Sequence, residues 1–356
     1  MKTKSIRNRL NHALDGNTVI EPVYLVYDSF VVNRKIDWQS LFDLGLGRIN
    51  HTSLVDIERP HLKITEIVSY DGEHKKTEVQ WITDIGELHE CSVDGWKREY
   101  PIKTSSDYKI MQRAFEDVRF IPTNKYFDES EQTLGGSGIT LGHLGKTNDQ
   151  CFFRTPFQGV QIEFVGLEQF SMDIAIELPE LMELLEMMNE QMLEAFRCVT
   201  KTKAIHIKLW ENLSIEIMGP ELFRKYQVPM YDKIIKILDG AGKKLHVHCD
   251  GKLQLIANDI QKLGFDGIDS LTPSPEGDIT IAEARQLWPE KFLWMHPSLT
   301  WDTLTDTELI NNILQMVRDA NTRFCFQISE EVPPDWKRTI PLILKTLNEY
   351  SQCDHS

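Results

Sequence analysis

The second half of the chain repeats one pattern: a short apolar segment, a polar or glycine- or proline-marked turn, and then a helix-like segment. The apolar segments that we expect to be strands are residues 204–210, 244–249, 265–271, 291–296 and 323–329. Strands that alternate with helices of about 10–15 residues are typical of parallel βαβ units. Such units in succession at the end of a 356-residue chain predict the latter part of a (β/α)8 TIM barrel.

The first half is less regular, and we expect it to complete and decorate the barrel. Residues 21–30 can form the first barrel strand, and the region of about 60–100 predicts an antiparallel β insertion at the barrel mouth, with turns at its DG pairs. Residues 121–150 are rich in glycine and polar residues, which favours a mobile loop, and residues 152–166 indicate a further strand and turn. Because no linker is evident, we interpret 1–356 as a single elaborated domain.

Composition narrows the classes of partner. A net charge of −15 argues against binding the phosphate backbone of a nucleic acid. The sequence contains no apolar run of about 18 residues, so no membrane span is predicted. The first residues lack the apolar stretch of a secretory signal. We therefore expect a cytoplasmic protein that acts on a small molecule.

The strongest candidate site lies at the end of the predicted strand 244–249. Successive strand side chains alternate between two faces, so His246, His248 and Asp250 share one face, which we expect to point into the barrel. Two imidazoles and a carboxylate can form a metal site or an acid–base cluster. The alternative is a hydrogen-bonded polar plug in the barrel core, an interpretation that suits His246 best because it lies deepest. His246 and Asp250 are both candidate catalytic residues.

Other polar residues follow the other predicted strands, where a TIM barrel places its active site. Glu211 follows 204–210 and Glu330 follows 323–329, and both are candidate metal ligands; Glu211 is also a candidate catalytic group. Glu331 is the alternative to Glu330, and either glutamate can instead be a capping or surface carboxylate. The candidate substrate-binding residues stand near further strand ends: Tyr27, Arg154, Thr272 and His296.

The residues from LHVHCDG through GFDGIDSLTP to ITIAEARQLW form a strand end, a helix, a second strand, a proline-containing loop and an Ala-Arg helix. This succession resembles the uroporphyrinogen decarboxylase (URO-D) superfamily. The opening KSIRNRLNHALDG and the closing FQISEEVPPDWKRTIPLILKTLNEY are similar to its first helix and its last strand and helix. The likeness spans most of the chain and is strongest from about 205 to 349.

The superfamily contains decarboxylases and methyltransferases. The positions at which this sequence differs from the decarboxylases indicate which branch it resembles more. Decarboxylases bind a substrate with several carboxylates through an arginine-rich opening loop, whereas the first strand here, EPVYLVYDSF, has no arginine. The methyltransferase branch binds zinc through His-x-Cys on one strand and a cysteine on the last. The resemblance places these ligands at His248, Asp250 and Glu330, with Glu211 as an alternative to Asp250. Cys249 is out of phase by one residue.

The resemblance thus implies a zinc site in which carboxylates replace thiolates, and such a site is a harder Lewis acid. It implies methyl transfer from an O- or N-methylated small molecule to a separate corrinoid protein, by an enzyme that can pair as a homodimer. The alternatives are a carboxy-lyase of the same superfamily that acts on an unidentified acid, and a barrel that serves as a binding subunit.

Overall fold

The computed structural model describes residues 5–145, 152–213 and 215–353. The chain forms two compact units, which we call the barrel unit and the insertion unit. The barrel unit comprises Met1–Thr52, Asn124–His143 and Lys203–Ser356, and the insertion unit comprises Ser53–Thr123 and Leu144–Thr202.

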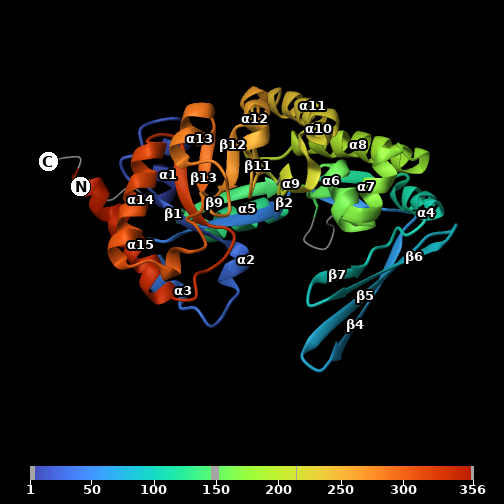
Figure 1. Ribbon diagram of the computed structural model, residues 1–356, viewed down its shortest axis with the longest axis horizontal. Coiled ribbons are helices and arrows are strands. Elements are labelled where there is room, and N and C mark those ends of the chain that lie inside the picture. Colours follow the sequence, from blue (N-terminus) through green and yellow to red (C-terminus); the bar gives the residue numbers. More distant parts are fainter. Residues whose placement is uncertain (1–4, 146–151, 214, 354–356) are drawn as a thin grey trace. The chain divides into compact units, whose positions relative to one another are not determined.

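A closed eight-stranded barrel forms the centre of the barrel unit (Figure 1). Its strands in chain order are β1 (Tyr24–Tyr27), β2 (Gly47–Ser53), β9 (Gly138–His143), β10 (His206–Leu209), β11 (Lys244–His248), β12 (Gly267–Leu271), β13 (Phe292–Met295) and β14 (Phe324–Ile328). Neighbouring strands run parallel, and β1 pairs with both β2 and β14. The predicted (β/α)8 barrel is confirmed.

One helix precedes the first strand of the barrel, and the other helices of this unit lie between the strands or after the last one. They are α1 (Ile6–Leu14), α2 (Asp28–Val31), α3 (Trp38–Asp43), α5 (Lys125–Leu134), α9 (Ile215–Met218), α10 (Pro220–Leu222), α11 (Val228–Asp239), α12 (Ala257–Lys262), α13 (Ile281–Leu287), α14 (Asp306–Ala320) and α15 (Trp336–Cys353). In α14, a capping box between Thr305 and Glu308 satisfies backbone donors at its start. Its buried Leu309, Ile313 and Met316 recur at helical spacing, so one face packs inward.

The segment 121–150, which the sequence indicated as a mobile loop, differs in the structure. It contains helix α5 and the barrel strand β9, while 146–150 lie outside the described residues. The glycines here serve packing: a Cβ on Gly138 would lie 1.9 Å from the backbone oxygen of Arg48. High glycine content therefore marked close backbone contact and not mobility.

The insertion unit contains the predicted antiparallel strands. One sheet has the order β4 (Lys63–Asp71), β5 (His74–Ile82), β6 (Glu87–Val93), β7 (Trp96–Glu99), and a second pairs β3 (Val55–Glu58) with β8 (Arg119–Pro122). The helices are α4 (Ser105–Phe115), α6 (Pro156–Gly159), α7 (Leu167–Ala175) and α8 (Pro179–Val199). No helix in the described part of the chain is both long and apolar enough to span a membrane.

Residues 152–166, where the sequence indicated a strand, are largely helical: α6 continues into a π-helix over Val160–Val165. Pro156 occupies the start of α6, where its missing N–H costs nothing. The buried Phe157, Val160 and Phe164 are three and four residues apart, which is a helical spacing.

Candidate metal centre

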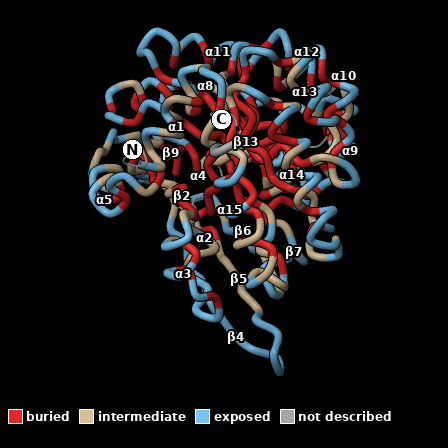
Figure 2. Tube along the Cα trace, turned by 90° about the vertical axis from the view of Figure 1, so that its left-hand side faces the viewer, coloured by how far each residue is buried: buried red, intermediate tan, exposed pale blue. Residues whose placement is uncertain are grey.

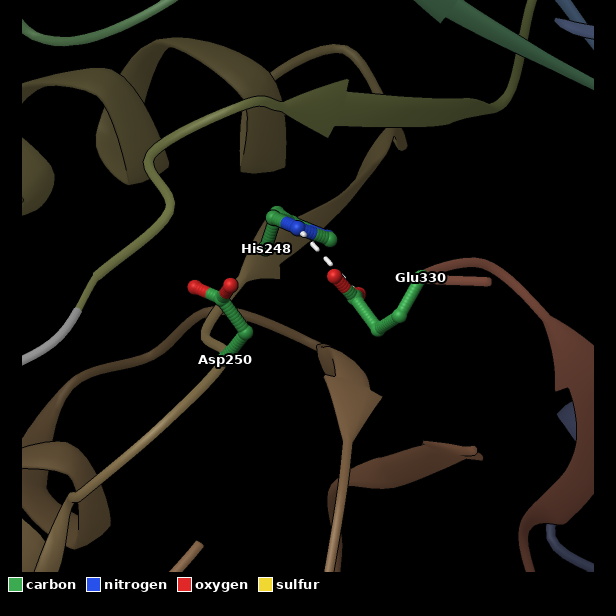
Figure 3. Close-up of side chains that lie close together, drawn as sticks. All are labelled: His248, Asp250 and Glu330. Carbon is green, nitrogen blue, oxygen red and sulfur yellow. Dashed lines mark ion pairs between the residues drawn. The ribbon is translucent and has the colours of Figure 1, made fainter. Parts of the chain in front are cut away.

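Three side chains from two sequence-distant segments converge at the carboxyl ends of the barrel strands (Figure 3). His248 is the last residue of β11, Asp250 lies two residues beyond it, and Glu330 lies two residues beyond β14. One ligand atom from each lies within 4.8 Å of the others, and His248 Nε2 is 3.7 Å from Glu330 Oε1. His248 is buried, whereas both carboxylates are partly exposed. A histidine nitrogen and two carboxylate oxygens form a donor set suited to a divalent transition metal.

The carboxylate of Asp269, on the neighbouring strand β12, supports the imidazole of His248. Asp269 is fully buried, and its Oδ2 lies 3.5 Å from His248 Nδ1. It accepts hydrogen bonds from the Tyr27 hydroxyl (2.9 and 3.0 Å) and from Gln327 Nε2 (2.7 Å). A carboxylate behind one ring nitrogen of a metal-binding histidine fixes the tautomer and leaves the other nitrogen for the metal.

A buried lysine balances the charge of this carboxylate. Lys208 on β10 forms an ion pair with Asp269 in which both side chains are fully buried. Its Nζ also donates to the Tyr27 hydroxyl (2.5 Å) and lies 3.5 Å from the ring centre of Trp210. Burial alone would raise the pKa of Asp269, but Lys208 and His248 hold it well below its ordinary value. The carboxylate beside His248 is therefore ionised and held rigidly.

A bulge in β12 brings a second side chain toward the site. The register of β12 against β13 shifts between Asp269 and Leu271, and Ser270 between them has φ 64. The Ser270 hydroxyl donates to Glu330 and lies 2.9 Å from the Ser329 hydroxyl. Burial raises the pKa of Glu330, while His248 and Ser270 oppose that change. Bulges and strained backbone of this kind concentrate at functional sites.

His246 lies deeper in the barrel, in a closed hydrogen-bond chain. Trp294 Nε1 donates to its Nδ1 (3.0 Å), so the proton of the neutral ring is on Nε2, which lies 2.9 Å from His206 Nδ1. A Cβ on Gly267 would lie 2.2 Å from His246 Nδ1, so glycine is required there. Burial lowers the pKa of His246 well below its ordinary value. The structure places this candidate catalytic residue apart from the metal group.

The structure does not bring Glu211 into the group of His248, Asp250 and Glu330. Glu211 is fully buried, and its charge contributes to raising the pKa of Tyr231 and of Cys249, both of which burial raises first. Its charge therefore lies close enough to Tyr231 and Cys249 to affect both groups.

The candidate substrate-binding residues have different surroundings. His296 is fully buried; its Nε2 accepts from the Glu331 backbone N–H (3.4 Å), and its Nδ1 has no hydrogen-bond partner among the described residues. Burial lowers the pKa of His296 to about 3, with His248 acting in the same direction. Thr272 donates to the Ser270 carbonyl (3.1 Å), and Tyr27 belongs to the Asp269 network.

Arg154 belongs to the insertion unit, where its Nη1 lies 2.6 Å from Glu163 Oε1. Its guanidinium is therefore engaged within that unit.

Sequence reasoning missed Asp269, Lys208 and Ser270. The strands HIKL and GIDSL could have indicated them. In each strand a charged residue interrupts an apolar segment, on the face that points into the barrel as the two histidines do. A charge at an inward position of a buried parallel strand requires a partner.

Comparisons with known proteins give structural neighbours only. No protein-family profile and no curated protein matches the sequence. Similar solved structures include a methyltransferase from Methanosarcina mazei (13% identity, TM-score 0.48), with 65% of this chain and 64% of that chain covered. Another is a B12-independent methionine synthase from Shewanella sp. W3-18-1 (10% identity, TM-score 0.43), with 90% and 86% covered. The chain thus spans less than two thirds of the Methanosarcina protein, and likenesses this weak carry no argument about activity.

Proposed function

We propose that this chain is a methyltransferase of the URO-D superfamily that transfers a methyl group from the oxygen or nitrogen of a small substrate to a corrinoid protein. The observation that carries the proposal is the convergence of His248, Asp250 and Glu330 at the barrel mouth. The sequence resemblance, in which these positions correspond to zinc ligands, supplies the reaction class. The structural neighbours add no support to the proposal, because their sequence identity to this chain is low.

The donor set fits zinc. Zinc–ligand distances of about 2.0–2.2 Å place adjacent ligand atoms roughly 3.4 Å apart in a tetrahedron. The separation of 3.7 Å between His248 Nε2 and Glu330 Oε1 is close to that spacing. His248 Nδ1 lies 3.5 Å from the buried Asp269 Oδ2, on the side of the ring where a metal-binding histidine usually has a carboxylate. Zinc bound there would act as a Lewis acid toward the heteroatom of the methyl donor.

The protein groups around this site have separable roles in the proposal. Asp269, held by Lys208 and Tyr27, orients His248. Because His296 Nε2 accepts a hydrogen bond, the ring proton is on Nδ1, which has no partner among the described residues and can donate to the substrate. The partial exposure of Asp250 and Glu330 leaves the site open to a substrate and to a corrinoid protein.

The experiment is methyl transfer to free cob(I)alamin. Zinc-loaded protein is incubated with cob(I)alamin and a panel of methoxylated aromatics and methylamines, and methylcob(III)alamin is followed by its absorbance. We expect methylation with at least one donor class, loss of it in His248→Ala, and little change in Glu331→Gln, a matched control next to a proposed ligand. Zinc-independent transfer would contradict the Lewis-acid role. Release of CO₂ from a supplied acid, without methyl transfer, would favour the carboxy-lyase alternative.

A further inference from the structure

Strand β4 is an unpaired edge of the four-stranded sheet. Its nine residues pair with β5 on one side, and no other strand of the described chain pairs with it. Nearly the whole strand is exposed, as the pale blue end of this hairpin shows (Figure 2). The exposed residues include Ile67 and Tyr70, with 64% and 70% of their surface accessible. An exposed strand edge of this length is a template for pairing with another strand.

The hairpin turn determines which backbone groups face the free edge. The two-residue loop between β4 and β5 has Gly72 at φ 62 in its first position, as in a type II′ turn. Asp71 and His74 flank this loop, and in such a hairpin the flanking pair exchanges both hydrogen bonds. Because bonded and non-bonded pairs alternate, alternate residues of β4 point their N–H and C=O groups outward. These residues are Ile64, Glu66, Val68 and Tyr70.

The strand lacks the features that usually protect an edge. It contains no proline, and its register against β5 is continuous from Lys63 to Asp71, so no bulge twists it away. Charged side chains can also protect a strand edge, and β4 has one lysine and two acidic residues. Two of these three, Lys63 and Asp71, stand at opposite ends of the strand. That placement suits a partner that runs antiparallel.

The sequence KITEIVSYD is complementary to itself in antiparallel orientation about Ile67. A second copy placed on that two-fold axis sets Lys63 opposite Asp71 at both ends and Thr65 opposite Ser69. Opposite charges and paired hydroxyl residues across strands are favourable. Ile64 then stands opposite Tyr70, and Ile67 stands opposite itself.

The same axis also matches the free backbone groups. With Ile67 at the centre, the outward-facing residues pair only with one another: Ile64 with Tyr70, and Glu66 with Val68. Moving the axis by one residue in either direction separates Lys63 from Asp71 and leaves one outward-facing residue without an opposite. One register therefore satisfies both the charges and the hydrogen bonds.

We propose that β4 pairs antiparallel with β4 of a second copy of this chain, joining two four-stranded sheets edge to edge in a two-fold symmetric dimer. The pairing is independent of the chemistry proposed for the barrel mouth.

Charge reversal tests the register. The oligomeric state and dimer Kd are measured by sedimentation for the wild type, Lys63→Glu, Asp71→Lys and the double variant. We expect a wild-type dimer, a Kd at least tenfold weaker in each single variant, and recovery to within about threefold in the double variant. A monomeric wild type, or a double variant as weak as the singles combined, would overturn the proposal. Circular dichroism of each variant shows that the fold is retained.

A cysteine cross-link tests the axis. Opposed Cα atoms in a non-hydrogen-bonded antiparallel pair lie about 4.5 Å apart, which a disulfide can bridge. In a Cys91→Ser background, which removes the half-exposed thiol that this sheet already carries, Ile67→Cys should give a disulfide-linked dimer on mild oxidation. Thr65→Cys, which faces Ser69 of the second copy, should give no more than the background. Equal linking of both variants, or none at position 67, would contradict the proposed axis. A β4 that pairs instead with another protein would show as failure of both cross-links.

Discussion

Two histidines stand on the same face of β11, two residues apart, and their surroundings differ. Both ring nitrogens of His246 take part in a closed chain with Trp294 and His206. His248 has Asp269 behind one nitrogen and Glu330 beyond the other, with neither contact at normal hydrogen-bond length. At the amino end of the barrel, His246 uses both ring nitrogens in hydrogen bonds within the protein, which indicates a structural role. At the carboxyl end, the ring nitrogens of His248 are not used in this way, so this residue can bind a ligand.

The charged residues show the same division. At the amino end, the ion pairs of Lys244 with Asp266 and of Arg323 with Glu290 border a cavity of about 350 Å³ and are partly exposed. Near the carboxyl end, the pair of Lys208 with Asp269 is fully buried. Removing one partner of a buried ion pair leaves the other charge buried and uncompensated, which strongly destabilises the fold. The pair therefore holds Asp269 firmly in the position from which it orients His248.

The largest expected effect comes from removing the charge of Asp269. Asp269→Asn leaves Lys208 buried beside a neutral amide, and we expect a loss of about 3–5 kcal/mol in the free energy of unfolding, measured with denaturant. The matched control is Glu216→Gln, which breaks the exposed pair with Lys252 and should leave the unfolding midpoint nearly unchanged. A loss below about 1 kcal/mol for Asp269→Asn would mean that the buried pair has little role in holding the barrel mouth.

His246→Ala should be next in size. The variant removes a packed ring and leaves Trp294 Nε1 without its acceptor, so we expect a loss of about 2–4 kcal/mol in the free energy of unfolding. His246→Gln keeps an acceptor and should recover part of that loss. Because the ring lies apart from the metal group, zinc affinity should be unchanged in both variants. Loss of zinc in His246→Ala without loss of stability would reverse the assignment of the two histidines.

The histidine pair at the amino end should also make the fold sensitive to acid. Burial lowers the pKa of His206 from 6.5 to about 4. Between these values the unfolded chain binds more protons at this residue than the folded one, so stability falls as the pH falls from 6.5 to 4, by about 3 kcal/mol from this group. Unfolding midpoints measured across that range should fall less steeply in His206→Gln. An unchanged slope would contradict the assignment.

The smallest expected effect concerns the strained residue of the β12 bulge. Because Ser270 has φ 64, Ser270→Gly relieves backbone strain that Ser270→Ala keeps, while both lose the hydroxyl bonded to Glu330. We expect the glycine variant to be more stable than the alanine variant by about 1 kcal/mol in thermal unfolding. Equal stability would show that the bulge is relaxed.

The sequence was informative where chemistry follows strand periodicity. Alternation on β11 placed His248 and Asp250 together, and position after a strand end placed Glu330 beside them. The partner of His248 escaped notice because a charged residue within a strand is ordinarily interpreted as solvent-exposed. Its burial became evident only when the barrel brought Lys208 against Asp269, 61 positions later in the chain.

Other residues lay where local backbone geometry, and not periodicity, decides direction. Asn212 has φ 47, and Glu211 just before it is fully buried and does not belong to the group of His248, Asp250 and Glu330. The helix α5 and the strand β9 were hidden because glycines required for close packing have the same sequence signature as a flexible loop.

The most direct test of the account is zinc binding by the metal-stripped protein, measured by calorimetric titration and elemental analysis in the wild type, His248→Ala, Glu330→Gln and His246→Gln. We expect one zinc per chain in the wild type and in His246→Gln, and at least a hundredfold weaker binding in the other two variants. Equal binding in all four proteins, or none in the wild type, would contradict a metal centre formed by His248, Asp250 and Glu330.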